Sequence, residues 1–362
     1  MTDLLSSALP PIPVPGMPQT TFSDAELDAE ADRLVAALGQ PERWSRAACR
    51  GLAPLTLEIN RLKREKGAFI LAHSYQTADI IYGVADAVGD SYGLAKVAKQ
   101  RDEDTIVFSS VRFMAETAKI VNPAKTVLHP SPEAGCSLAD GITAEQVRAL
   151  KAQHPGVPVV CYINTTAAVK AECDASVTSS NYLDICRKIP GDELIFVPDA
   201  FMGRHLQAAI PEKTIHIWDA TCEVHDRFTG DAVQAWKQRA AADGRELVVL
   251  VHPECGEDVL AQADYIGSTE KMMEYARQLE AEGRVDVMPI TECGTADRMR
   301  AENPGLNITG ACVLCPHMKR TTLSDILQVL QGPRPDQVIE IEADVLDGAR
   351  ANLDAMFALA EA

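Results

Sequence analysis

Short apolar runs recur along the chain, and each run ends in a cluster of polar residues. Three of these runs have the length of a single strand and continue directly into polar side chains. They cover residues 68–72, 159–161 and 247–251. His73, Asn164 and His252 stand at equivalent places in the three clusters, and their residue numbers differ by 91 and by 88. This near-constant interval predicts a structural unit that occurs three times.

Two further features repeat at a similar interval. In each unit a second short strand precedes a helix, and a later strand leads to a cysteine on a loop. The second strands are predicted at residues 105–108, 176–180 and 265–269, and the later strands at residues 125–128, 213–218 and 307–309. The residue numbers of Cys136, Cys222 and Cys315 differ by 86 and by 93. Strands that alternate with helical stretches predict an α/β fold with parallel sheets.

The repeat predicts three similar αβα three-layer units with parallel sheets, arranged around a pseudo-threefold axis. Because ligands bind beyond the carboxyl ends of parallel strands, the active site is expected at the central junction. The units are predicted at residues 23–140, 141–223 and 224–319. The C-terminal segment, residues 320–362, is expected to pack back on the first unit. Residues 1–22 are Pro-rich and are expected to form a flexible arm.

The composition excludes several classes of protein. Among 362 residues there are 52 Asp+Glu and 34 Lys+Arg, so the net charge is −18. This excess of acid argues against nucleic-acid binding, because phosphate backbones require clustered cations. No stretch approaches the ~20 apolar residues that span a bilayer, so no membrane contact is expected. The first residues lack the features of a secretory signal, so a cytoplasmic location with reduced cysteines is expected, and disulfides are not.

Ten cysteines raise the prospect of metal or thiol chemistry. Four of them are expected to be small apolar residues of the core. These are Cys49, Cys161, Cys173 and Cys186. Three cysteines that converge from three loops suit a metal centre with an open position, since structural zinc usually has four protein ligands and a [4Fe–4S] cluster on three thiolates leaves one iron free. A redox pair or half of a zinc knuckle at Cys312 and Cys315 stays open as an alternative.

A set of short motifs, in order along the chain from about residue 57 to residue 330, resembles the quinolinate synthase family. The motifs are residues 72–76 (AHSYQ), 111–120 (VRFMAETAKI), 134–138 (AGCSL), 162–165 (YINT), 178–180 (TSS), 251–254 (VHPE), 267–269 (GST) and 315–319 (CPHMK). Each motif is short, but the set is specific.

The resemblance implies a dehydrating condensation of the transferase class (EC 2.5.1) in NAD biosynthesis. Iminoaspartate would condense with dihydroxyacetone phosphate, with loss of phosphate and two waters, to give quinolinate. It also implies a [4Fe–4S] cluster on Cys136, Cys222 and Cys315, with Cys312 as a second cysteine that is not a ligand. Some members carry three cysteines in this segment, but the first place is Thr309 here, so disulfide chemistry would be limited to the Cys312–Cys315 pair. An enzyme that produces iminoaspartate is a possible functional partner.

The resemblance also assigns roles to individual residues. The proton-transfer and orienting residues would be His73, Tyr75, Tyr162, His252 and Glu254. The substrate-binding residues would be Ser91, Asn164, Ser179, His225, Ser268, Thr269 and Thr291. Hydroxyl and amide donors at strand ends and helix N-termini suit carboxylate and phosphate oxygens. A lone serine at such a place is more often a helix cap or turn residue, and the repetition of Ser179 and Ser268 in two units favours a binding role.

Two other functions fit the sequence less well. An iron–sulfur redox sensor should carry a DNA-binding motif or a docking segment, and neither is evident in the sequence. A solute-binding protein of doubly wound units would not need three converging thiols. The turn at residues 89–91 has neither the GxGxxG pattern nor the GK[ST] ending of a phosphate loop, so NAD is not expected as a cofactor.

Overall fold

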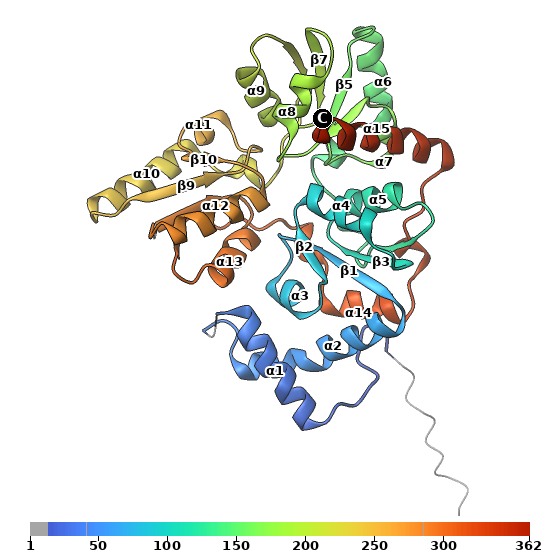
Figure 1. Cartoon of the computed structure of the whole chain (residues 1–362), viewed down its shortest axis with the longest axis vertical. Coiled ribbons are helices and arrows are strands. Elements are labelled where there is room, and N and C mark those ends of the chain that lie inside the picture. Colours follow the sequence, from blue (N-terminus) through green and yellow to red (C-terminus); the bar gives the residue numbers. More distant parts are fainter. Residues whose placement is uncertain (1–13, 41, 285) are drawn as a thin grey trace, which may run out of the picture.

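Three four-stranded parallel sheets form the framework of the protein (Figure 1). The structure is a computed structural model and describes residues 14–40, 42–284 and 286–362. The expected arm at residues 1–22 therefore lies mostly outside the described residues. The strand order is β2-β1-β3-β4 in the first sheet, and the same pattern recurs as β6-β5-β7-β8 and β10-β9-β11-β12. The predicted α/β fold of three similar αβα units is confirmed.

The first unit contains two N-terminal helices and the first sheet with its helices. Its helices are α1 (Asp24–Leu38), α2 (Arg46–Glu65), α3 (Ala78–Gly83), α4 (Ser91–Gln100) and α5 (Arg112–Val121). Its strands are β1 (Ala68–His73), β2 (Ala87–Gly89), β3 (Thr105–Ser109) and β4 (Thr126–Leu128), followed by the 3₁₀ helix η1 (Ala139–Gly141). Ser23 begins α1 with a capping box to Glu26, which satisfies amide groups that the helix itself leaves free.

The second and third units repeat the alternation of strand and helix. The second contains α6 (Ala144–Gln153), β5 (Val159–Tyr162), α7 (Ala167–Ala171), β6 (Ala175–Val177), α8 (Tyr182–Lys188), β7 (Glu193–Val197), α9 (Ala200–Ala209), β8 (Thr214–Ile217) and η2 (His225–Arg227). The third contains α10 (Gly230–Ala242), β9 (Leu247–Val251), α11 (Glu257–Leu260), β10 (Tyr265–Ile266), α12 (Thr269–Ala281), β11 (Asp286–Ile290), α13 (Cys293–Glu302), β12 (Asn307–Ile308) and η3 (Met318–Arg320).

Two helices complete the chain, with η4 (Pro335–Gln337) between them. Helix α14 (Leu323–Gln331) packs against α2 of the first unit. Helix α15 (Ala343–Glu361) packs mainly against α7, β6 and α8 of the second unit and also touches α5 of the first. The C-terminal segment thus lies against the first and the second unit (Figure 1).

The central strand of each sheet consists of a nearly continuous run of apolar residues. Every residue of β1, β5 and β9 is buried, because helices cover both faces of each sheet. The four cysteines assigned to the core are all buried among apolar neighbours, as predicted. Among the described helices, none is both long and apolar enough to cross a membrane.

One predicted correspondence between the units is wrong. The strand at residues 105–108 was matched with those at 176–180 and 265–269, but it is β3, the counterpart of β7 and β11. The true counterpart of β6 and β10 in the first unit is β2, which pairs with β1 through residues 87–89. A strand of three residues has too little apolar pattern to be recognised before its neighbour is known. The correct match places Ser91, the first residue of α4, at the position of Thr269, the first residue of α12.

Asn352 is a buried polar residue that joins α15 to the second sheet. Its amide nitrogen donates to the carbonyl oxygen of Cys173 at 3.1 Å, and its amide oxygen accepts from the Ser176 hydroxyl. Asn352→Ala should lower the free energy of unfolding by about 2 kcal/mol, because two buried polar groups lose their partner. Denaturant unfolding of wild type, of Asn352→Ala and of a control variant measures this free energy. The matched control is Asp354→Ala on the exposed face of the same helix, which should change stability by less than about 0.5 kcal/mol.

Candidate functional site

A cavity of about 60 Å³ lies where the carboxyl ends of the three sheets meet, and residues of all three units line it. Most of the residues proposed from the sequence reach this cavity. They are His73, Tyr75, Ser91, Cys136, Tyr162, Asn164, Ser179, Cys222, His225, His252, Glu254, Thr269 and Cys315. Parallel strands deliver their following loops to the same edge, which explains why residues so distant in the sequence meet here.

Ser268 and Thr291 lie outside the lining of this cavity. Ser268 is buried and caps α12, where its hydroxyl accepts from the amide of Lys271 at 3.4 Å. The hydroxyl of Thr291 is 2.7 Å from that of Tyr75 and 2.9 Å from Nε2 of His225. Thr291 therefore holds two residues of the cavity wall together, and Ser268 acts as a helix cap.

The three cysteine loops share one local structure. A threonine follows each cysteine by seven residues and caps the next helix, with a 3₁₀ turn between them. The pairs are Cys136 with Thr143, Cys222 with Thr229, and Cys315 with Thr322. This spacing is visible in the sequence and was missed there. It identifies Cys315, rather than Cys312, as the counterpart of Cys136 and Cys222.

The same turns aim backbone amides at the sulfur atoms. The amide groups two and three residues after Cys136, and likewise after Cys222 and Cys315, favour a thiolate at each position. Burial has the larger effect: it raises the pKa of Cys136 to about 12 and that of Cys315 to about 11, and it also raises the pKa of Cys222. Thiolates at this site therefore need a compensating positive charge, which a bound metal supplies.

A second arrangement of ligands overlaps the first. One ligand atom each from Cys222, His225 and Glu254 lie within 4.8 Å of one another. Thiolate, imidazole and carboxylate are all ligands that zinc or iron accepts. The site thus has donors for a metal centre by either arrangement, and the residues present fit such a group.

Glu254 is the centre of a buried hydrogen-bond network. Its carboxylate accepts from the Tyr162 hydroxyl at 2.5 Å and from Nδ1 of His225 at 2.9 Å. Burial by itself would raise the pKa of this carboxyl group. The interaction with His225 and the hydrogen bond from Tyr162 outweigh burial and hold the pKa of Glu254 well below its usual range. An ionised, acceptor-only carboxylate therefore faces the cavity.

His73 is the last residue of β1 and His252 is the first residue after β9, so the two histidines stand at similar places in their units. The amide two residues later donates to Nδ1 of each ring, from Tyr75 at 3.1 Å and from Glu254 at 3.4 Å. Burial lowers the pKa of both histidines to about 3, so both are neutral near pH 7. Since Nδ1 accepts, Nε2 carries the proton, and each ring offers an N–H donor to a ligand.

Sequence reasoning missed Lys170, which shapes the loop after β5. Its side chain is fully buried, and Nζ donates to the carbonyl oxygen of Ile163 at 2.7 Å and to that of Thr165. These hydrogen bonds hold the backbone in place on both sides of Asn164, a residue of the cavity wall. No sequence signal identifies such a lysine, because lysines on helices are usually exposed.

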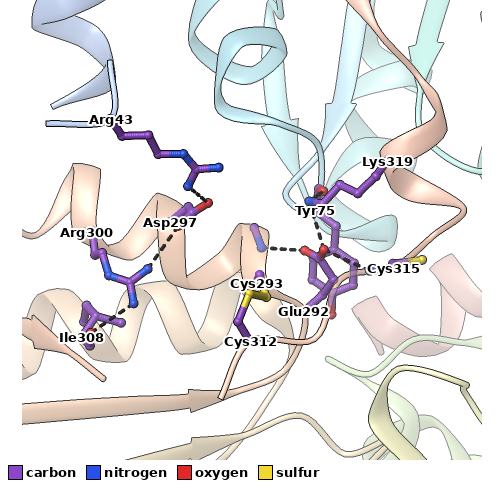
Figure 2. Close-up of a disulfide and its surroundings, with 11 residues drawn as sticks. Arg43, Tyr75, Glu292, Cys293, Asp297, Arg300, Ile308, Cys312, Cys315 and Lys319 are labelled. Carbon is purple, nitrogen blue, oxygen red and sulfur yellow. Dashed lines mark hydrogen bonds and ion pairs between the residues drawn. A yellow bond between two sulfur atoms is a disulfide. The ribbon is translucent and has the colours of Figure 1, made fainter. Parts of the chain in front are cut away.

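A disulfide joins Cys293 and Cys312, whose Cα atoms are 5.1 Å apart (Figure 2). Two expectations are therefore wrong: that disulfides are absent, and that any pairing would join Cys312 to Cys315. Cys293 begins α13 after β11, and Cys312 follows β12. Since β11 and β12 are hydrogen-bonded neighbours, their following loops meet although 19 residues separate the two cysteines.

Fold and site define a class of α/β protein with three repeated units and a central, thiol-lined cavity suited to a metal centre and a small polar ligand. The family described as Quinolinate synthetase A protein matches residues 57–358. The chain belongs to this family, as the sequence motifs indicated.

Curated relatives agree with this membership. The chain is 45% identical over 311 residues to the quinolinate synthase of Caulobacter vibrioides, covering 85% of this chain and 82% of the relative. It is 44% identical to quinolinate synthase 2 of Mesorhizobium japonicum, covering 82% and 89% of the two chains. It is 42% identical to the quinolinate synthase of Xylella fastidiosa, covering 83% and 86%.

The disulfide has a direct test. Protein alkylated without reduction and then digested should contain one linked pair of peptides, with Cys293 in one and Cys312 in the other, and an unlinked Cys315. Mass spectrometry identifies the pair, and a digest made after reduction is the control. A link between Cys312 and Cys315 would contradict the structure.

Proposed function

We propose that this protein synthesises quinolinate, a precursor of NAD, from iminoaspartate and dihydroxyacetone phosphate. The products besides quinolinate are phosphate and two waters, so atoms and electrons balance without an oxidant. The observation that carries the proposal is the threefold cysteine loop, which opens into the same cavity as His73, His252 and Glu254. This pairing of thiols with proton-transfer groups fits a dehydrating condensation better than a redox sensor, which would not need the polar groups.

A [4Fe–4S] cluster on Cys136, Cys222 and Cys315 is the cofactor we propose. With three protein thiolates, its fourth iron would act as a Lewis acid toward a substrate oxygen. The support is the identical loop structure at the three cysteines and their common cavity. A single ion on Cys222, His225 and Glu254 is the second candidate, favoured by the closeness of those ligand atoms.

The walls of the cavity supply donors for the anionic groups of the substrates. Ser91, Asn164, Ser179 and Thr269 bring hydroxyl and amide groups from all three units. Ser91 and Thr269 are also the first residues of α4 and α12, where free backbone amides favour negative charge. We assign these residues to the carboxylates and the phosphate.

We assign proton transfer to side chains that differ in their protonation state, namely two neutral imidazoles and one ionised carboxylate. The neutral rings of His73 and His252 donate through Nε2 to oxygen atoms that gain charge or leave. The ionised Glu254 is the acceptor for a proton taken from carbon, and Tyr162 orients it. Burial raises the pKa of Tyr75, which therefore stays protonated and acts as a hydroxyl donor. The burial of His73, Tyr162, His252 and Glu254 limits the access of water to a reactive imine.

The substrate iminoaspartate is an imine that hydrolyses readily in water, so it must reach the cavity soon after it is made. We therefore propose functional coupling to an enzyme that produces iminoaspartate, so that the imine reaches this cavity soon after it forms. Neither nucleic acid nor membrane enters the proposed reaction.

Purified protein, reconstituted without oxygen, should bind about four iron and four sulfide per chain and form quinolinate from the two substrates. Cys136→Ala, Cys222→Ala and Cys315→Ala should each lose most of the iron and all activity. Cys186→Ala, which alters a buried core cysteine, is the control and should keep both. A wild-type protein with one metal ion and no sulfide would support the second candidate site. A cluster-loaded protein that forms no quinolinate would refute the proposed reaction.

Glu254→Gln should lower kcat at least about 100-fold, because the amide neither accepts a proton nor accepts from both Tyr162 and His225. Steady-state kinetics on protein with a measured iron content separates this effect from loss of the cofactor. Glu257→Gln, on the exposed surface three residues later, is the matched control and should leave kcat unchanged. Unchanged turnover in Glu254→Gln would remove Glu254 from proton transfer.

A further inference from the structure

Glu292 is a completely buried carboxylate that stands just outside the cavity. It lies between the end of β11 and the start of α13, and none of its surface is exposed. Its side-chain oxygen Oε2 accepts from the amide of Gly294 at 2.6 Å and so caps α13. A surface cap would suffice for that purpose, since exposed side chains cap other helices of this chain.

The other oxygen of Glu292 reaches the third cysteine loop. Oε1 accepts from the backbone amide of Cys315 at 3.2 Å and from Nζ of Lys319 at 3.0 Å. The same Nζ donates to the carbonyl oxygen of Tyr75 (Figure 2). One carboxylate thus connects α13, the loop that carries Cys315, and, through Lys319, the loop after β1 in the first unit.

We propose that Glu292 is a positioning residue that sets the place of Cys315 and Tyr75 in the cavity. The proposal rests on the proposed function only in treating Cys315 as a ligand of the cofactor. Glu292 does not touch the cavity, so its effect acts through the backbone that it holds.

The chemistry of the site demands a carboxylate. Every hydrogen-bonding partner that the structure gives these two oxygens is a donor: two backbone amides and one ammonium group. A glutamine in this place directs its NH₂ group at a donor in either orientation, so at least one contact is lost. Charge-assisted hydrogen bonds are also about twice as strong as neutral ones, which makes this loss larger than that of an ordinary cap.

The disulfide holds the same loop independently. Cys312 is tied to Cys293 by the disulfide (Figure 2). The amide of Cys293 also donates to the carbonyl oxygen of Val313 at 3.1 Å. These contacts fix the start of the loop, three residues before Cys315. Glu292 fixes Cys315 itself, so its loss should loosen Cys315 even while the disulfide is intact.

The first experiment measures hydrogen exchange in protein without cofactor. In Glu292→Gln, the backbone amides of residues 313–319 other than Pro316 should exchange about tenfold faster than in wild type, because the neutral side chain loses its contact to Gly294 or to Cys315 and also the ion pair with Lys319. The loops that carry Cys136 and Cys222 serve as internal controls and should exchange as in wild type. Glu30→Gln is the control variant. Glu30 is also buried and accepts hydrogen bonds, from Arg33 and Thr56, but it lies far from Glu292 along the chain, in α1, where that helix packs against α2.

The second experiment measures how firmly the reconstituted protein keeps its iron. Iron should pass from Glu292→Gln to a chelator about tenfold faster than from wild type, whereas Glu30→Gln should match wild type. Glu292→Asp keeps the charge but shortens the side chain, and its exchange and iron loss should fall between those of wild type and Glu292→Gln. If Glu292→Gln does not fold, Glu292→Asp compared with wild type decides the question.

The outcomes separate this proposal from the function on which it rests. Wild-type protein that binds no iron, together with faster exchange in Glu292→Gln, would refute the cluster and support the positioning role. Exchange of residues 313–319 at the wild-type rate in both Glu292 variants would overturn the positioning role, whatever the iron content.

Discussion

The burial of three parallel sheets on both faces is the constraint on which the other features of this protein depend. Strands such as β1, β5 and β9 are buried along their whole length, so polar groups can appear only where the strands end. Parallel pairing brings these ends to one edge of each sheet. Three sheets with the same strand order then present three sets of loops to one cavity, and the thiols, imidazoles and hydroxyls meet there.

Burial also sets the charges in the cavity. The same loss of water lowers the pKa of His73 and His252 and raises that of the three cysteine thiols. Glu254 is the exception, since its donors favour the ionised form more strongly than burial opposes it. The cavity thus combines neutral donors with one anionic acceptor, and its sulfur atoms favour a cationic partner. The condensation we propose would use this division of roles, since it moves protons and expels oxygen groups.

Most of the fold could be predicted from local patterns in the sequence, whereas most residues of the cavity wall were predicted from the resemblance to the quinolinate synthase family. Apolar runs, the polar residues that follow them and the cysteine loops all repeat within short segments. The errors have a common origin in contacts between segments. The strand β2 is too short to be recognised without β1 beside it, and the partner of Cys312 is decided by the pairing of β11 with β12. Lys170 and Glu292 gave no signal, since their value lies in backbone groups that only the folded chain brings to them.

The sequence by itself determined that the chain has three similar α/β units, that polar residues follow their central strands, and that a cysteine closes each unit. Hydrophobic periodicity and residue order are enough for this, because they act over a few residues at a time. Only the tertiary structure decided that Cys293 pairs with Cys312 and that Glu292 contacts the loop of Cys315. These outcomes depend on which strands are neighbours, and in each sheet the order in space differs from the order along the chain.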